Sequence, residues 1–301
     1  MFAVMHNAGA AQISIRHHVM GPVITHSEAC ASSAVAIADG CRAIRSGEID
    51  LAIAGGAEAP LTDAVFGAWN AMRVLAPPDP VDVARSCRPF DRSRAGVVLG
   101  EGSAFFVLEA AECAERRGIP AYAEVCGFGI GADAHHIGAP QLEGEVRTIR
   151  AALRDAHLEP QDIDCYNAHA TGTRAGDAIE AGAIRQAFGE HATRMPVSAP
   201  KSVHGHVFGA TSAIELMIAM VGMVESFLPA TASLDDVDPE CALNHVAKVP
   251  VESGPMGRAL SFSAGFGGTN AAIVLGRCAD GRGITTKTGA VDSVSTNPKG
   301  D

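Results

Sequence analysis

The sequence predicts an α/β fold in which helices cover parallel or mixed sheets on both faces. Short apolar runs rich in β-branched residues alternate along its 301 residues with longer segments of helical periodicity. Hydrophobic residues make up 47 % of the chain, charged residues only 19 %, and there are 33 glycines. This composition is typical of a compact enzyme with many tight turns. The length permits one large domain or two closely packed halves.

Strand and helix signals follow each other in a regular order. The segments with strand character are residues 22–25, 51–55, 104–109, 123–127, 165–167, 196–198, 259–263 and 271–275. Helical periodicity, bounded by small, polar or glycine residues, covers residues 31–46, 143–157, 177–188 and 209–225. Residues 76–94 and 229–255 lack sustained periodicity, and we expect them to cross the surface as irregular loops.

Charge and cysteine usage exclude several classes of function. A formal net charge of −11 and the absence of a Lys/Arg run disfavour nucleic-acid binding. The eight cysteines include no CxxC pair, the histidines show no HExxH spacing, and no secretory signal is apparent, so we expect a cytoplasmic protein without a metal site. The longest apolar stretch, 210–228, is interrupted by Glu215 and Glu225, which favours a buried helix over a membrane span.

Cys30 is the first candidate for chemistry. It lies in HSEACASSAVAIADGCRAI, where a predicted strand runs directly into a predicted helix of small residues. Unpaired backbone N–H groups and the helix dipole at a helix N-terminus favour a thiolate, and they would lower the thiol pKa from its reference of about 8.5. Taken alone, such a cysteine is more often a small buried apolar residue.

His169 ends a predicted strand in CYNAHATGTRAGDAIEA, before a Thr/Gly turn that leads into a helix. Strand ends of this kind are where open α/β folds place ligands. Thr171 and Thr173 offer hydroxyls beside the histidine, while Asp177 and Glu180 lie one helical turn apart and can share a face. A lone histidine in such a turn is more often structural than catalytic.

Two further segments carry reactive or flexible residues. SAPKSVHGHVFGATSAIE places Lys201, His204 and His206 ahead of a long apolar helix, where they could form a site or simply pair with an acid and cap the helix. SFSAGFGGTNAAIVLG places Phe266 and three glycines in a loop between two predicted strands. Such a loop permits unusual backbone angles and close backbone approach. It does not match a dinucleotide fingerprint, and no P-loop is present in the sequence.

Together and in this order, these segments resemble the elongating β-ketoacyl-acyl carrier protein synthases from about residue 7 to residue 276. EACASS resembles the family's nucleophile motif and NAHATGT its first catalytic-histidine motif. PKSVHGH resembles its lysine and second-histidine motif, and GFGGTN its C-terminal glycine-rich loop. IAGGAEA and RPFDRSRAGVVLGEG match between them. Four motifs in the family's order make the resemblance specific.

The resemblance implies a thiolase-like, five-layered α-β-α-β-α fold and a decarboxylative Claisen condensation. Cys30 would take an acyl chain from the phosphopantetheine arm of an acyl carrier protein. His169 and His206 would stabilise the enolate oxyanion that forms when a malonyl carrier loses CO₂. The backbone N–H groups of Cys30 and Phe266 would form a second oxyanion site, with the Phe266 ring as a gate to the acyl pocket. No bound cofactor is implied.

The resemblance also implies supporting residues. Lys201 and Glu180 would form a pair that orders the active site. The hydroxyls of Thr171 and Thr173 would contact the pantetheine arm. The glycines that would give the gate its mobility are Gly265, Gly267 and Gly268.

The N-terminal region departs from the family pattern. Family members carry on the order of a hundred further residues before the nucleophile, and Glu28 stands where they usually have threonine. We therefore expect an incomplete N-terminal half over residues 1–110, a C-terminal half with both histidines over 111–278, and a disordered tail over 279–301. An incomplete half leaves apolar faces uncovered, so we expect the isolated chain to aggregate or to bind a partner.

Several alternatives remain open at this level. Family members are commonly homodimers, so a homodimer or a heterodimer with a related synthase subunit is implied, besides the carrier protein. A non-catalytic subunit that determines chain length is the main alternative, together with an inactive fragment; such subunits usually lack the cysteine, so Cys30 favours catalysis. A thiolase is disfavoured because GFGGTN contains no cysteine, and an initiating synthase is disfavoured by His206, where that subgroup has asparagine.

Overall fold

Helices and strands alternate along the chain in the predicted manner. The computed structural model describes residues 5–278. The described α-helices are α1 (Ala8–His17), α2 (Ser32–Arg45), α3 (Asp63–Ala71), α4 (Ala111–Arg117), α5 (Leu142–Asp155), α6 (Arg174–Phe188), α7 (Lys201–His204) and α8 (Thr211–Glu225). The described strands are β1 (Leu51–Glu58), β2 (Gly102–Glu109), β3 (Ala123–Ala132), β4 (Cys165–Asn167), β5 (Pro196–Ser198), β6 (Phe227–Leu228), β7 (Asn244–His245), β8 (Val251–Glu252), β9 (Arg258–Ala264) and β10 (Thr269–Arg277).

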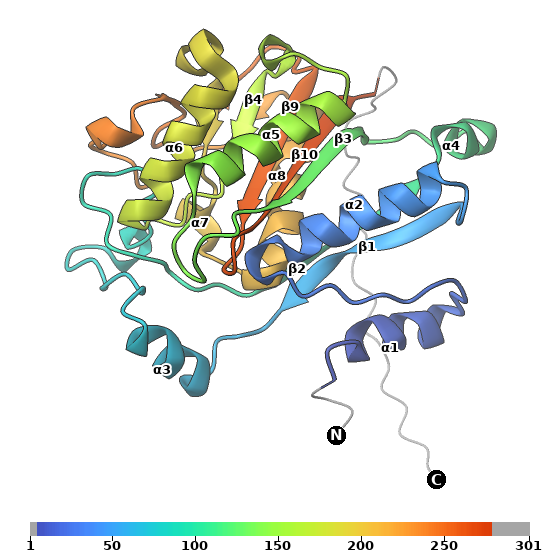
Figure 1. Ribbon diagram of the computed structural model, residues 1–301, viewed down its shortest axis with the longest axis horizontal. Coiled ribbons are helices and arrows are strands. Elements are labelled where there is room, and N and C mark those ends of the chain that lie inside the picture. The colour runs from blue at the N-terminus through green and yellow to red at the C-terminus, as the bar shows by residue number, and fades with distance from the viewer. Residues whose placement is uncertain (1–4, 279–301) are drawn as a thin grey trace, which may run out of the picture.

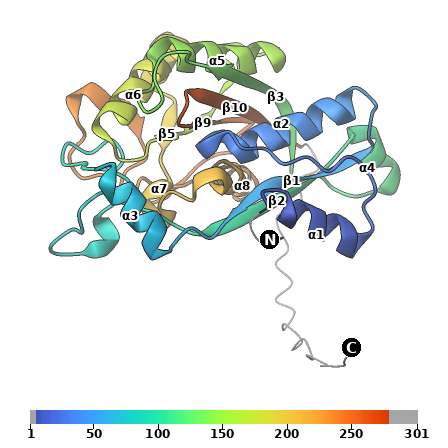
Figure 2. The same ribbon diagram turned by 60° about the horizontal axis from the view of Figure 1, so that its bottom comes forward.

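These elements stack in layers, which confirms the predicted α/β class. Helices α5 and α6 lie on one face of a six-stranded sheet of order β3-β10-β9-β4-β5-β7 (Figure 1). Helices α2 and α8 lie on its other face and separate it from the two-stranded sheet of β1 and β2 (Figure 2). One hydrophobic cluster lies on the α5 and α6 side of the large sheet, and a second lies around α2 and α8.

The large sheet is built around β10, which pairs antiparallel with both β3 and β9. Helix α5 packs closely on β3 because Gly127 and Gly129 carry no side chain: a Cβ at Gly129 would lie 2.3 Å from the carbonyl oxygen of Thr148. On the other side of β9, strands β4 and β5 run parallel to it and to each other. Their carboxyl ends therefore reach the same edge of the sheet, where His169 follows β4 in a loop and Lys201 begins helix α7 after β5.

Helix α8 is a core helix. By length and composition alone, residues 208–225 are apolar enough to cross a membrane. Their buried side chains, Glu215 and Leu216 among them, face other elements, and α8 contacts α2, β2 and β9. The predicted buried helix is therefore confirmed.

The structure differs from the sequence prediction at the N-terminus and in several short elements. Residues 22–25 form no strand, because no described strand lies beside them to accept their hydrogen bonds; Val23 and Ile24 are 45 % and 60 % exposed. Helices α1, α3, α4 and α7 have no counterpart in the prediction, and β7 and β8 occur inside the stretch expected to be irregular. The tail over 279–301 lies outside the described residues, and the division into halves at residue 110 stays a prediction.

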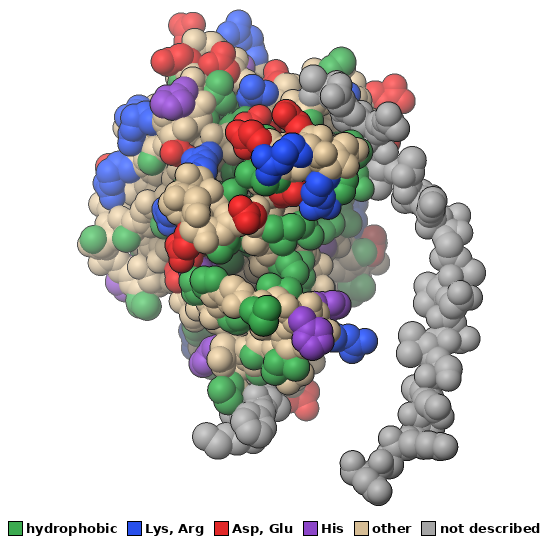
Figure 3. Space-filling view, turned by 90° about the vertical axis from the view of Figure 1, so that its right-hand side faces the viewer, with side chains coloured by type: hydrophobic (Ala, Val, Ile, Leu, Met, Phe, Trp, Pro, Cys, Tyr) green, Lys and Arg blue, Asp and Glu red, His purple; other side chains and the backbone are tan. Residues whose placement is uncertain are grey.

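The two-stranded sheet exposes an apolar outer face, which we call the β1–β2 face and define by Leu51, Ile53, Phe105 and Val107. Their exposed fractions run from 40 % to 67 %. Ile53 lies directly opposite Val107 in the ladder, whereas Ala54 and Ala104, which point to the opposite side, are buried against α2 and α8. Hydrophobic side chains also gather across the middle of the side of the molecule where α1 and α4 lie (Figure 3). Exposed apolar patches of this kind promote association.

We expect the isolated chain to self-associate in a concentration-dependent manner through the β1–β2 face. The double variant Ile53→Lys/Val107→Lys should shift sedimentation velocity profiles toward the monomer, because facing lysines place charge in the centre of the contact. Val81→Lys, at a 93 % exposed loop position, is the matched control and should sediment like the parent chain. Identical profiles for the parent chain and the double variant would show that this face is not the contact.

Candidate active site

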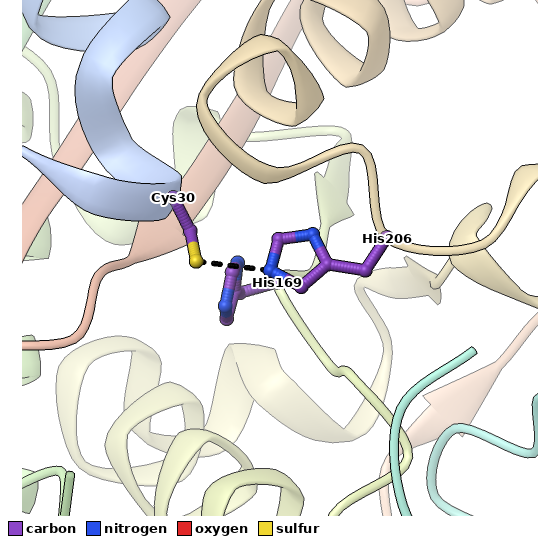
Figure 4. Close-up of side chains that lie close together, drawn as sticks. All are labelled: Cys30, His169 and His206. Carbon is purple, nitrogen blue, oxygen red and sulfur yellow. Dashed lines mark hydrogen bonds between the residues drawn. The ribbon is translucent and has the colours of Figure 1, made fainter. Parts of the chain in front are cut away.

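Three reactive side chains from distant segments converge on one point. Cys30 belongs to a single 3₁₀ turn (Ala29–Ala31) that precedes α2, His169 follows β4, and His206 lies between α7 and α8. The Nε2 atom of His206 lies 2.9 Å from the Sγ atom of Cys30. The ring of His169 stands edge-on to that of His206, with 5.6 Å between the ring centroids (Figure 4). The structure thus brings together the three residues that the sequence singled out as a catalytic set.

A tight turn, rather than the end of a strand, presents Cys30. Ala29 has a positive φ of 51°. The Ser32 hydroxyl fixes the turn, because it accepts the Glu28 N–H and donates to the Ala29 carbonyl. The backbone N–H groups of Cys30 and Phe266 lie beside the sulfur and favour its thiolate form. Two N–H groups beside one reacting atom are the arrangement of an oxyanion hole.

Burial, however, dominates the ionisation of this thiol. It raises the pKa of Cys30 to about 11, and neither the Lys201 charge nor the two backbone N–H groups offset it. The expectation of a lowered pKa at a helix N-terminus is therefore wrong. The physical reason is that the Cys30 residue is only 6 % exposed, so its thiolate lacks the water that would solvate its charge. At neutral pH Cys30 is a thiol.

Alkylation of Cys30 should consequently keep accelerating far above neutral pH. Below a pKa of about 11, the thiolate fraction and the iodoacetamide rate should each rise about tenfold per pH unit. Mass spectrometry of the Cys30 peptide after timed labelling measures this rate. N-acetylcysteine is the reference thiol and should level off near its ordinary pKa of about 8.5. A plateau for Cys30 in that same range would contradict the raised pKa.

The hydrogen-bond partners of the two histidines place a proton on the Nε2 atom of each ring. The Thr211 hydroxyl accepts the Val207 N–H and contacts His206 Nδ1 at 2.9 Å, so its own proton is directed to Nδ1. The Lys201 ammonium, which can only donate, lies 3.4 Å from His169 Nδ1. Burial, reinforced by the Lys201 charge, holds the pKa of each histidine well below its usual range. Both rings are therefore neutral N–H donors directed into the site.

Lys201 pairs with Glu215, not with Glu180 as the sequence implied. Lys201 Nζ lies 2.6 Å from Glu215 Oε1, and both side chains are completely buried. In the sequence Glu215 appears only as a charge that interrupts an apolar helix. An acid in such a helix was the one sequence feature that could have pointed to it as the buried partner of Lys201.

Glu180 instead accepts the backbone N–H groups of His169 and Ala170, each at 2.7 Å. Burial raises the pKa of this carboxyl to about 8. It orders the loop after β4, while the turn it supports brings the Thr171 and Thr173 hydroxyls to within 3.2 Å of each other.

A cavity of about 200 Å³ connects these groups. Cys30, both histidines, both threonines, Glu180 and the loop of Gly265, Phe266 and Gly268 line it; Gly267 does not. Trp69 on α3, which sequence reasoning missed, stacks on Phe266 with 5.7 Å between ring centroids. Gly265 is required by close approach, because a Cβ there would lie 2.6 Å from the Glu28 carbonyl oxygen. The Glu28 side chain itself is not part of the lining and lies beside His26.

The fold and this site define a thiolase-like α/β protein with a Cys–His–His centre. Comparison with known families gives the family itself: the N-terminal domain of β-ketoacyl synthases matches residues 1–114, and the C-terminal domain matches residues 122–235. The chain belongs to the β-ketoacyl synthase family, as its motifs implied.

Individual relatives agree with this assignment. Nodulation protein E of Rhizobium leguminosarum bv. trifolii is 43 % identical over 273 residues, which cover 90 % of this chain and 65 % of the relative. The 3-oxoacyl-[acyl-carrier-protein] synthase 2 of Staphylococcus aureus is 39 % identical over 266 residues, or 88 % and 65 % of the two chains. A type II polyketide ketosynthase, solved in complex with its acyl-carrier protein, superposes with a TM-score of 0.88 at 28 % identity, covering 90 % of this chain and 67 % of its own. The chain thus spans about two thirds of the length of these proteins.

Proposed function

We propose that this chain carries the chemistry of a β-ketoacyl-acyl carrier protein synthase: acyl transfer to Cys30 followed by decarboxylative condensation with a malonyl carrier. The observation that carries the proposal is the meeting of one thiol and two neutral imidazole N–H donors at a single cavity. A nucleophile and an oxyanion-binding pair are the two functions that the reaction requires. The intact Cys30 disfavours the alternative of a non-catalytic, chain-length-determining subunit.

In the first step the Cys30 sulfur attacks the thioester carbonyl of an acyl carrier protein. The new bond joins sulfur to the acyl carbon, the bond to the carrier's sulfur breaks, and the Cys30 proton ends on the carrier's thiol. The Cys30 and Phe266 N–H groups stabilise the oxyanion of the intermediate. Because the cysteine is a thiol at rest, attack and loss of its proton are coupled.

In the second step the malonyl thioester occupies the cavity with its carbonyl oxygen toward His169 and His206. Loss of CO₂ leaves an enolate, whose oxygen accepts both Nε2–H bonds. The enolate carbon then attacks the Cys30 thioester, a carbon–carbon bond forms, and the cysteine leaves as thiolate and regains a proton. Because Lys201 is paired with Glu215, the lysine charge behind the rings is offset by a buried partner.

The carrier's phosphopantetheine arm is the proposed route of delivery, with Thr171 and Thr173 as its hydrogen-bonding contacts. Both threonines line the cavity, and Phe266 with Trp69 forms an aromatic wall on which a gate can close. The Phe266 loop contains Gly267 and Gly268 at φ of 89° and 78°, which is where its conformational freedom resides. No resident cofactor is needed.

We further propose that the exposed β1–β2 face belongs to a subunit contact, in a homodimer or with a related synthase subunit.

Formation of an acyl-enzyme at Cys30 is the direct test. Incubation with radiolabelled acyl carrier protein should label the Cys30 peptide, and addition of malonyl carrier should chase the label into β-ketoacyl carrier. Cys30→Ala should abolish labelling, whereas Cys113→Ser, at a half-buried position on α4, should not change it. The measurement is made on the chain alone and on a chimaera bearing the N-terminal segment of the Staphylococcus aureus relative. Labelling at another cysteine, or none in either protein, would refute the assignment.

A further inference from the structure

We propose that Cys30, His169 and His206 also form a binding site for a soft divalent metal ion such as Zn²⁺ or Cd²⁺, which blocks the nucleophile when it binds. One ligand atom from each residue lies within 4.8 Å of the others. The three side chains reach this point from separate parts of the fold and are directed at a common space (Figure 4). No short motif joins them, which is why the spacing of cysteines and histidines gave no metal signal.

The donor set has the chemistry of a zinc site with an open position. Zinc is held by thiolate sulfur at about 2.3 Å and imidazole nitrogen at about 2.0 Å, and three protein ligands with a water in the fourth place are common. Tetrahedral ligands at those lengths lie roughly 3.3–3.6 Å from one another. The Cys30 Sγ–His206 Nε2 distance of 2.9 Å has to open to reach that range, and the wider spacings among the three ligand atoms, which extend up to 4.8 Å, have to close. The adjoining cavity supplies room for the water.

The described lining of the cavity includes no Lys or Arg that would repel a cation. Its acidic side chains are Asp133, Glu145 and Glu180, and burial raises the pKa of the two glutamates. Glu145 is 2 % exposed, and its Oε2 atom has no hydrogen-bond partner among residues 5–278. Lys201, which lies just behind His169, is already paired with Glu215 at 2.6 Å. Soft ions prefer thiolate and imidazole, whereas Mg²⁺ and Ca²⁺ prefer oxygen ligands.

Binding requires a rearrangement of protons that the surroundings can accommodate. The Cys30 thiol releases its proton to solvent, and each ring moves its proton from Nε2 to Nδ1. For His206 the Thr211 hydroxyl can rotate and accept that proton at 2.9 Å. For His169 the 3.4 Å contact with Lys201 must open, which leaves the lysine with Glu215. Such partners on the second ring nitrogen orient metal-bound histidines.

Titration with Cd²⁺ tests the proposal on the chain as it exists, without any turnover. One equivalent should produce an ultraviolet thiolate-to-cadmium charge-transfer band, Zn²⁺ should displace it, and Mg²⁺ should not. Cys30→Ser should lose the band. His169→Ala and His206→Ala should each weaken binding by at least the roughly 10–100-fold that loss of a second-shell partner costs. Cys113→Ser is the matched control and should bind like the parent chain.

Protection of the unmodified chain gives a readout that does not depend on the folding of any variant. Saturating Cd²⁺ should protect the Cys30 peptide from iodoacetamide while Mg²⁺ leaves its labelling unchanged. Equal labelling with and without Cd²⁺, an undiminished band in Cys30→Ser, or parent-like affinity in both histidine variants would each overturn the site. Since none of these measurements uses a carrier protein, they fail or succeed independently of the proposed condensation. If that condensation is correct, the bound ion would also prevent acylation.

Discussion

His169→Ala and His206→Ala should each lower malonyl decarboxylation by about 10²–10³-fold, the usual cost of removing one oxyanion donor. Each ring offers an Nε2–H to the same cavity, and each is fixed through Nδ1 by a separate partner, Lys201 or Thr211. Acyl transfer to Cys30 should remain measurable, because the oxyanion proposed for that step uses the backbone N–H groups of Cys30 and Phe266. The two steps are therefore expected to separate.

Release of CO₂ from malonyl carrier and labelling of the Cys30 peptide provide the two readouts, in the chain and in the chimaera described above. His17→Ala, on the exposed surface of α1, is the control and should match the parent in both. Decarboxylation at the parent rate in either active-site variant would remove that histidine from the oxyanion site. Loss of both steps together would point to a collapsed cavity rather than to a lost donor.

Lys201→Met should lower the free energy of unfolding by about 3–5 kcal/mol, because it leaves the Glu215 carboxylate buried and unpaired. Burial already raises the pKa of Glu215 to about 7 in the presence of the lysine. When the pKa of an acid is raised in the folded state, its protonated form favours folding. That contribution to the free energy of unfolding is lost as the pH rises through the folded-state pKa. The destabilisation should therefore be smaller in acid than above neutral pH. Urea unfolding at several pH values measures it.

The double variant Lys201→Met/Glu215→Leu should recover much of this loss, because it replaces the ion pair with apolar groups of similar volume. Lys248→Met is the matched control: Lys248 pairs with Asp235 but is 59 % exposed, so its removal should cost under about 1 kcal/mol. Equal effects at Lys201 and Lys248, or a double variant less stable than the single one, would contradict the buried pair as described.

Sequence patterns determined much of the fold. Alternating apolar runs and helical periodicity placed β1 to β5, β9 and β10 and helices α2, α5, α6 and α8, because their residues are buried on faces that repeat along the chain. The same patterns failed at residues 22–25, since a strand forms only where a neighbouring strand accepts its hydrogen bonds. Helices α1, α3 and α4 have no buried residues, so they leave little periodic signal.

By itself the sequence determined the α/β class, the family and the residue types of the site. This was possible because each motif is a short local segment and the order of the motifs along the chain can be read directly. Only the tertiary structure decided which residues act on one another. It paired Lys201 with Glu215 rather than Glu180, added Trp69 to the Phe266 wall, and gave Cys30 a raised pKa in place of the lowered one. The physical reason is that desolvation and ion pairing depend on burial and on distances between atoms of remote segments, and no spacing along the chain encodes either.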